Sequence, residues 1–101
     1  MITTITSKQG DKLQLPVVHL NGTSKRELKN LWLAPYSLIG DAYDQLKRAA
    51  PHMRDYYVLP GGGQAEFLTA QEQHYSRLRR LEQVREELET LCNGIDKQEG
   101  R

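Results

Sequence analysis

A Pro- and Gly-rich segment divides two long helical patterns, and this division constrains the fold more than any other feature of the sequence. Residues 51–63 contain Pro51, Pro60 and three consecutive glycines, none of which favours a continuing helix. Helical patterns of apolar residues cover residues 24–50 before this segment and residues 64–93 after it. Two helices joined by a short connection pack side by side in opposite directions. The sequence therefore predicts a mainly α-helical chain built on a long antiparallel helical hairpin.

The first helical pattern has a clear start and an internal interruption. Ser24 and Glu27 fit a capping box, in which the serine hydroxyl accepts from a free amide and the glutamate reaches back to the cap. Pro51 is expected to end the helix at about residue 50. Pro35 lies inside the pattern and removes one backbone hydrogen bond, so it should either kink the helix or split it in two.

The apolar residues of this helix form two stripes, and the two stripes are the reason to expect a homo-oligomer. The first stripe comprises Leu28, Leu31, Pro35, Leu38, Ala42 and Ala49, and the second comprises Trp32, Tyr36, Ile39, Tyr43 and Leu46. Each stripe alone would satisfy one neighbouring helix, so a two-helix hairpin covers only one of them. We expect the second stripe to contact another copy of the chain. The alternative is that an N-terminal β-hairpin covers it.

The second helical pattern carries a heptad of apolar residues that should pack on the first helix. Phe67, His74, Leu81 and Leu88 recur every seven residues, with Ala70, Val84 and Leu91 between them and with Leu78 and Cys92 at the flanks. Asn93-Gly94 is a helix-ending signal, so residues 94–101 are expected to form a polar tail. Elsewhere on this helix, four glutamates alternate with three arginines (Glu82, Glu86, Glu87, Glu89; Arg79, Arg80, Arg85). This alternation is typical of a solvated face with ion pairs between residues four apart.

Residues 1–20 have the composition of a short β-hairpin. Residues 2–7 are rich in β-branched side chains, Gln9-Gly10-Asp11 is a turn signal, and residues 12–20 fit a second strand. Pro16 cannot donate to a strand ladder, so this strand should break there or lie at an edge. With no internal repeat, all 101 residues are expected to form one domain.

Composition and motifs argue against several classes of function. The formal charge of +1 is too low for a protein that binds bulk nucleic acid. Cys92 lies near a helix end, where the helix dipole disfavours a thiolate, and no serine lies in a strand–turn–helix elbow, so we expect no enzyme. The three histidines lack metal-ligand spacing, so we expect no metal or other cofactor. No apolar run of signal-peptide or membrane-spanning length occurs, which predicts a cytoplasmic protein that does not enter a membrane.

Two segments are candidate ligand-binding sites. Asn21, Ser24, Lys25 and Arg26 gather amide, hydroxyl and cationic groups at a helix N-terminus, where anions bind well; ordinary helix capping is the alternative. Arg54 lies beside Tyr56 and Tyr57, and such a cluster pairs with phosphates and stacks on bases. The alternative is that both tyrosines pack under the loop while Arg54 pairs with Asp55. About 25 residues of helix, roughly 35–40 Å, separate the two segments, so only an antiparallel pair of copies would join them, with Arg77 facing the same space.

The same residues carry a resemblance to a group of small phage and prophage proteins of unassigned function. The matching residues are His19 to Ser24, Ala50-Pro51, Arg54 to Tyr57 and the helix around Gln71 to Leu91. The likeness covers about residues 18–92 and carries no activity with it. It implies a phage accessory role, by analogy with small oligomeric phage proteins that trap host nucleotide signals between their subunits.

These observations lead to two hypotheses about function. The first is a non-catalytic phage accessory protein of the host cytoplasm that sequesters a small anionic, nucleotide-like ligand, a host-defence signal, in pockets between its own copies. The alternative is a protein–protein adaptor or inhibitor that uses an exposed apolar helix face and the Tyr-rich loop. A stable homo-oligomer favours the first hypothesis, and a monomer with exposed apolar surface favours the second.

Overall fold

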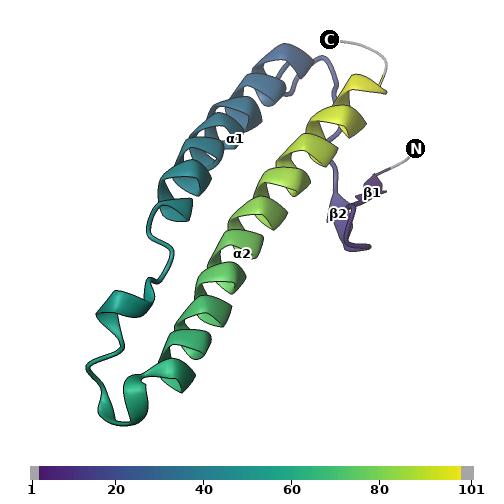
Figure 1. Cartoon of the computed structure of the whole chain (residues 1–101). Helices are drawn as coiled ribbons and strands as arrows, with labels where there is room; N and C mark the ends of the chain where they lie inside the picture. Colours follow the sequence, from purple (N-terminus) through teal and green to yellow (C-terminus); the bar gives the residue numbers. More distant parts are fainter. Residues whose placement is uncertain (1–2, 99–101) are drawn as a thin grey trace.

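The computed structural model describes residues 3–98 and confirms a mainly helical fold with two long helices packed together. Its elements are strands β1 (Thr4–Thr6) and β2 (Lys12–Gln14), helix α1 (Lys25–Lys47), the short 3-10 helices η1 (Met53–Asp55) and η2 (Pro60–Gly62), and helix α2 (Gln64–Asp96). Helices α1 and α2 run antiparallel, and the chain between them forms one end of the molecule (Figure 1). Neither helix in the described part of the chain has the length and apolar character needed to cross a membrane.

Helix α1 is one continuous helix that contains Pro35. Of the two alternatives at Pro35, division of the helix therefore does not occur. Proline leaves the carbonyl of Leu31, four residues earlier, without its helical partner. Leu31 lies on the exposed side of α1, where water can satisfy that carbonyl, and this explains why the helix continues. The Ser24 hydroxyl accepts from the Glu27 amide at 3.2 Å, which is one half of the predicted capping box; among the described residues the Glu27 carboxylate makes no hydrogen bond back to the cap.

The end of α1 falls at Lys47, three residues before the predicted end. The amides of Arg48, Ala49 and Ala50 donate to carbonyls three residues back, at 2.9–3.3 Å, which is the tighter 3-10 pattern. Pro51 explains this tightening, because the residue before a proline is disfavoured in the α conformation.

Helix α2 continues past Asn93-Gly94 to Asp96, so the predicted helix end at residue 93 is wrong. Gly94 is buried, and a Cβ at this position would lie 2.8 Å from Leu15 Cδ2 and 3.2 Å from Ile5 Cδ1. Its lack of a side chain lets the N-terminal β-hairpin approach the helix closely. This glycine serves packing and does not end the helix.

The N-terminal strands pair in antiparallel register, with Ile5 opposite Leu13. Strand β2 ends at Gln14, shorter than predicted, because the chain reaches Pro16 two residues later. The hairpin lies on the opposite side of α2 from α1 (Figure 1). It therefore packs on α2 and does not cover the second apolar stripe of α1.

The core is thin, and the surface of α2 that faces it differs from the predicted heptad. The buried apolar residues of the described chain are Leu15, Val18, Leu78, Cys92 and Ile95. On α2, the buried and half-buried residues facing the core are His74, Leu78, Leu81, Arg85, Leu88, Cys92 and Ile95, spaced alternately four and three. Val84, predicted to lie in this row, is 46% exposed. The prediction failed here because the central position of this row is occupied by Arg85, which is not an apolar residue.

The two apolar stripes of α1 have different surroundings. All five residues of the second stripe, from Trp32 to Leu46, are half-buried, and Tyr36 of this stripe contacts α2. In the first stripe, Leu31 and Leu38 are 61% and 67% exposed. No residue of α1 is fully buried. Within one chain, the first stripe is thus the more exposed of the two, although the second was expected to face another copy.

Candidate binding surface

The candidate anion site at the start of α1 is partly engaged in holding the fold together. Lys25 Nζ donates to the main-chain oxygens of Asp96, at 3.4 Å, and of Gln98. Lys29 Nζ pairs with the Asp96 carboxylate at 2.6 Å. Cations at the carbonyl end of a helix are favourable, so these lysines stabilise the end of α2. Ser24 caps α1 in turn.

Two members of this predicted site remain exposed to solvent. Asn21 and Arg26 are both exposed, and neither side chain makes a hydrogen bond or ion pair within the described residues. The capping alternative therefore accounts for Ser24, and the C-terminus of α2 accounts for Lys25. Of the four residues predicted to form this site, Asn21 and Arg26 remain available to an external ligand.

The segment between the helices is folded into successive turns. The amide of Tyr56 donates to the Met53 carbonyl at 3.0 Å, and the amide of Leu59 donates to the Tyr56 carbonyl at 3.0 Å. His52 Nδ1 accepts from the Arg54 amide at 3.2 Å and caps the first turn. Backbone hydrogen bonds therefore hold this end of the hairpin in one defined shape.

Gly63 joins these turns to α2 and is required there for two reasons. Its φ of +69° lies in the left-handed region, and an added Cβ would overlap the carbonyl oxygen of Tyr56. The chain can turn this tightly into α2 only because residue 63 has no side chain.

The two tyrosines of this segment have different environments. Tyr56 is half-buried, and its ring lies 5.9 Å from that of Phe67 in a tilted arrangement. Tyr57 is 61% exposed and Val58 is 74% exposed, and Leu59 and Arg54 are exposed as well. We call Arg54, Tyr57, Val58 and Leu59 the tip surface. It presents three large apolar side chains and one cation on an ordered turn, which is a feature of recognition surfaces.

Arg77, the remaining predicted ligand residue, lies apart from both segments. It is exposed on α2, 13 residues after the start of that helix, which corresponds to roughly 20 Å. The start of α1 and the tip surface lie at opposite ends of a molecule 65 Å long (Figure 1). One chain therefore does not bring the two predicted segments into one pocket.

Arg85 makes a structural contact between the helices that sequence reasoning missed. Its Nε donates to the Tyr36 carbonyl at 3.3 Å, and its Cζ lies 4.2 Å from the centre of the Tyr36 ring. The side chain passes close to Gly40, whose lack of a side chain makes room for the guanidinium. Gly40 follows Tyr36 by four residues and so lies on the same helix face. This spacing was the one sequence feature that could have indicated a large side chain packing over Tyr36. Arg85 therefore joins α1 to α2 and does not belong to the solvated charged face.

The predicted ion pairs along α2 are also absent from the described residues. The ion pairs of the described chain are Lys29–Asp96, which joins α1 to the end of α2, and Lys47–Asp44, an exposed pair within α1 at 3.6 Å. The glutamates of α2 instead reach the β-hairpin at one point, where Gln9 donates to the Glu86 carboxylate.

The groups with reactive potential lie in the core. Burial raises the pKa of the Cys92 thiol, and Asp96 and Glu89 add to this increase, while Lys29 opposes it. His74 is buried beside Tyr43 and Lys47 of α1, and its Nε2 has no hydrogen-bond partner in the described chain. No cluster of His, Cys, Asp or Glu among residues 3–98 has the arrangement of a metal site.

We compared the chain with known proteins in three ways. A scan against protein-family models, a search of curated proteins and a search of solved structures each found no match.

Proposed function

We propose that this chain is a non-catalytic protein-interaction module that recognises another protein through the tip surface. The observation that carries this proposal is the exposure of Tyr57 and Val58, at 61% and 74%, on a turn held by backbone hydrogen bonds. Leaving large apolar side chains in water forgoes about 1.5–3 kcal/mol for each one that could be buried. Ordered exposed aromatic groups also bind partners with little further loss of conformational entropy.

The tip surface also indicates the chemistry of the partner. The apolar residues of the tip surface would fit a shallow apolar pocket on the partner. Arg54 would pair with a carboxylate at the rim of that pocket. Tyrosine and arginine are enriched among the residues that contribute most to protein–protein binding energy. We therefore expect a protein partner with an acidic edge beside an apolar depression.

Site-specific photo-cross-linking in cells tests this proposal. A photoreactive phenylalanine analogue at position 58 should form a discrete adduct with one protein, whereas the same analogue at Val84, on α2, should not. The adduct partner is then purified and its affinity is measured against Tyr57→Ser, with Leu68→Ser as the matched exposed control. We expect Tyr57→Ser to weaken binding at least 30-fold, as a loss of about 2 kcal/mol predicts, and Leu68→Ser to leave it unchanged. Equal affinities, or no discrete adduct, would refute a role for the tip surface.

A second candidate function is the binding of a small phosphate-bearing, nucleotide-like ligand between two copies. The exposure of Arg54 beside Tyr57 favours it, because this pair could hold a phosphate and stack on a base. Asn21 and Arg26 would complete the pocket from another copy, and the resemblance to phage proteins suggests a host-defence nucleotide signal. We rank this candidate second because Ser24 and Lys25 have structural partners.

Thermal-shift measurements with cyclic and linear nucleotides test this second candidate. A ligand present at 100 times its Kd should stabilise the protein by about 2.7 kcal/mol and raise the Tm accordingly. Arg54→Gln should abolish the shift, and Arg77→Gln should leave it intact if Arg77 lies outside the pocket. No shift with any nucleotide would eliminate this function.

A further inference from the structure

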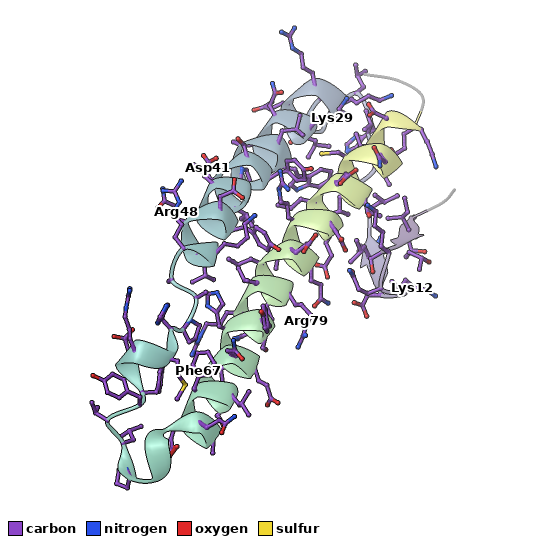
Figure 2. The ribbon with its side chains drawn as sticks, viewed as in Figure 1. Lys12, Lys29, Asp41, Arg48, Phe67 and Arg79 are labelled. Atoms are coloured by element: carbon purple, nitrogen blue, oxygen red, sulfur yellow. The ribbon has the colours of Figure 1, made fainter. Side chains whose placement is uncertain are left out.

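The outer side of α1 is apolar and uncovered along its central turns. Leu31, Ala34, Leu38 and Ala42 succeed one another at spacings of three and four, and all four are exposed. We call these four residues the outer face. The β-hairpin lies beyond α2, so it does not reach the outer face (Figure 1). Figure 2 shows Asp41 and Arg48 on the same outward side of α1, away from α2.

The molecule exposes more surface than a compact chain of its mass. Its accessible surface is 7,318 Å² at 11.6 kDa. A compact monomer of this mass exposes about 5,800 Å². The radius of gyration is 19.5 Å, whereas a compact domain of this length has about 13 Å. The excess of about 1,500 Å² is larger than the roughly 800 Å² that each partner buries in an ordinary protein–protein interface.

We propose that a second copy of the chain packs its own outer face against this one, in antiparallel orientation. A two-fold axis between Leu31 and Leu38 would place each leucine opposite the other leucine of the partner copy. Such an interface is self-complementary and closes as a dimer. Ala34 and Ala42 are small, which lets the two α1 helices approach closely. Every α1 helix then lies between its own α2 and a partner α1.

The charge on the outward side of α1 disfavours a parallel orientation. Lys25 and Lys29 are held at the end of α2, whereas Asp41 lies on the outward side of α1 (Figure 2). A parallel dimer would place Asp41 beside its own copy, and like charges at an interface oppose association.

This dimer does not depend on recognition at the tip surface, but it has a consequence for it. The tip of one copy would approach the start of α1 in the other. Arg26 of one copy would then lie opposite Tyr43 of the other, which is nearer to Arg54 and Tyr57 than one chain alone places it. The dimer is therefore required for the nucleotide candidate and optional for the protein-interaction module.

Sedimentation equilibrium of the full chain tests the proposal. The wild type at tens of micromolar should have twice the 11.6 kDa monomer mass. Leu31→Lys/Leu38→Lys should have the monomer mass, and circular dichroism at 222 nm checks that it remains helical. Leu68→Lys, at a position 51% exposed on α2, is the matched control and should stay dimeric. A monomeric wild type overturns the proposal, and a dimeric double variant shows that the outer face is not the interface.

Further variants keep the test decisive. If the double variant does not fold, the milder Leu38→Ser should still raise the dimer dissociation constant at least tenfold, and an unchanged constant overturns the proposal.

Disulfide trapping in a Cys92→Ala background reports the orientation of the two copies. Mixed Leu31→Cys and Leu38→Cys chains should form the 31–38 disulfide between copies. Disulfides joining 31 to 31 and 38 to 38 instead would overturn the antiparallel arrangement. Tyr57→Ser should leave the dimer intact, which separates this proposal from the function of the tip surface.

Discussion

The same substitution, glycine to alanine, should have different effects at two helical positions of this protein. In a helix interior the change is favourable by about 1 kcal/mol, because glycine loses more backbone entropy on folding. At Gly94 the new Cβ would lie 2.8 Å from Leu15 Cδ2 and 3.2 Å from Ile5 Cδ1. Leu15 is itself buried, so it has little room to move. Overpacking of this kind costs about 1–3 kcal/mol. We therefore expect Gly94→Ala to lower the free energy of unfolding by about 1 kcal/mol.

Position 40 offers the matched comparison. A Cβ on Gly40 would lie 2.9 Å from an Arg85 guanidinium nitrogen, which is the far end of a flexible side chain. Moving that side chain weakens a cation–π contact worth about 0.5–1 kcal/mol. The loss roughly offsets the helix gain, so Gly40→Ala should change the unfolding free energy by less than about 0.5 kcal/mol.

Urea unfolding followed at 222 nm, at one fixed protein concentration, measures the difference between the two variants. Gly94→Ala should unfold more easily than Gly40→Ala by about 1 kcal/mol, or about 4–8 °C in Tm. Gly10→Ala, at a φ of +90° with open space around it, reports backbone strain without packing. If Gly94→Ala were as stable as Gly40→Ala, the β-hairpin would not pack on α2 as described.

Three further effects follow from the core and the turn. Ile95→Ala, at the most buried side chain, should cost about 2–5 kcal/mol in chemical denaturation, whereas Val84→Ala, at a half-exposed position, should cost less than about 1 kcal/mol. Because burial raises the pKa of Cys92, the unfolded chain loses the thiol proton first as pH rises. The unfolding free energy should then fall above about pH 8.5, and a Cys92→Ala variant with the same slope would contradict this assignment. Gly63→Ala should disorder the tip surface, which limited proteolysis between the helices would detect as faster cleavage; unchanged cleavage would argue against the turn geometry.

The sequence by itself determined the parts of the fold that depend on local chemistry. The capping box at Ser24, the prolines and glycines between the helices, and the helical periodicity on both sides each act over a few residues. They therefore predicted the antiparallel hairpin and the start of each helix. The β-branched residues likewise predicted the N-terminal strand pair, although Pro16 shortened the second strand.

Only the tertiary structure decided which surfaces meet. Helix α1 carries two apolar stripes, and no local rule states which one faces α2. In the structure the second stripe is half-buried, and Arg85 donates to the Tyr36 carbonyl across the helices. Gly94 is a helix-ending residue by local preference, yet packing of Leu15 against it lets α2 continue. Lys25 is a plausible anion ligand by type, yet the end of α2 lies within its reach. These outcomes depend on residues far apart in the chain, and local preferences, which amount to about 1 kcal/mol or less per residue, do not report such contacts.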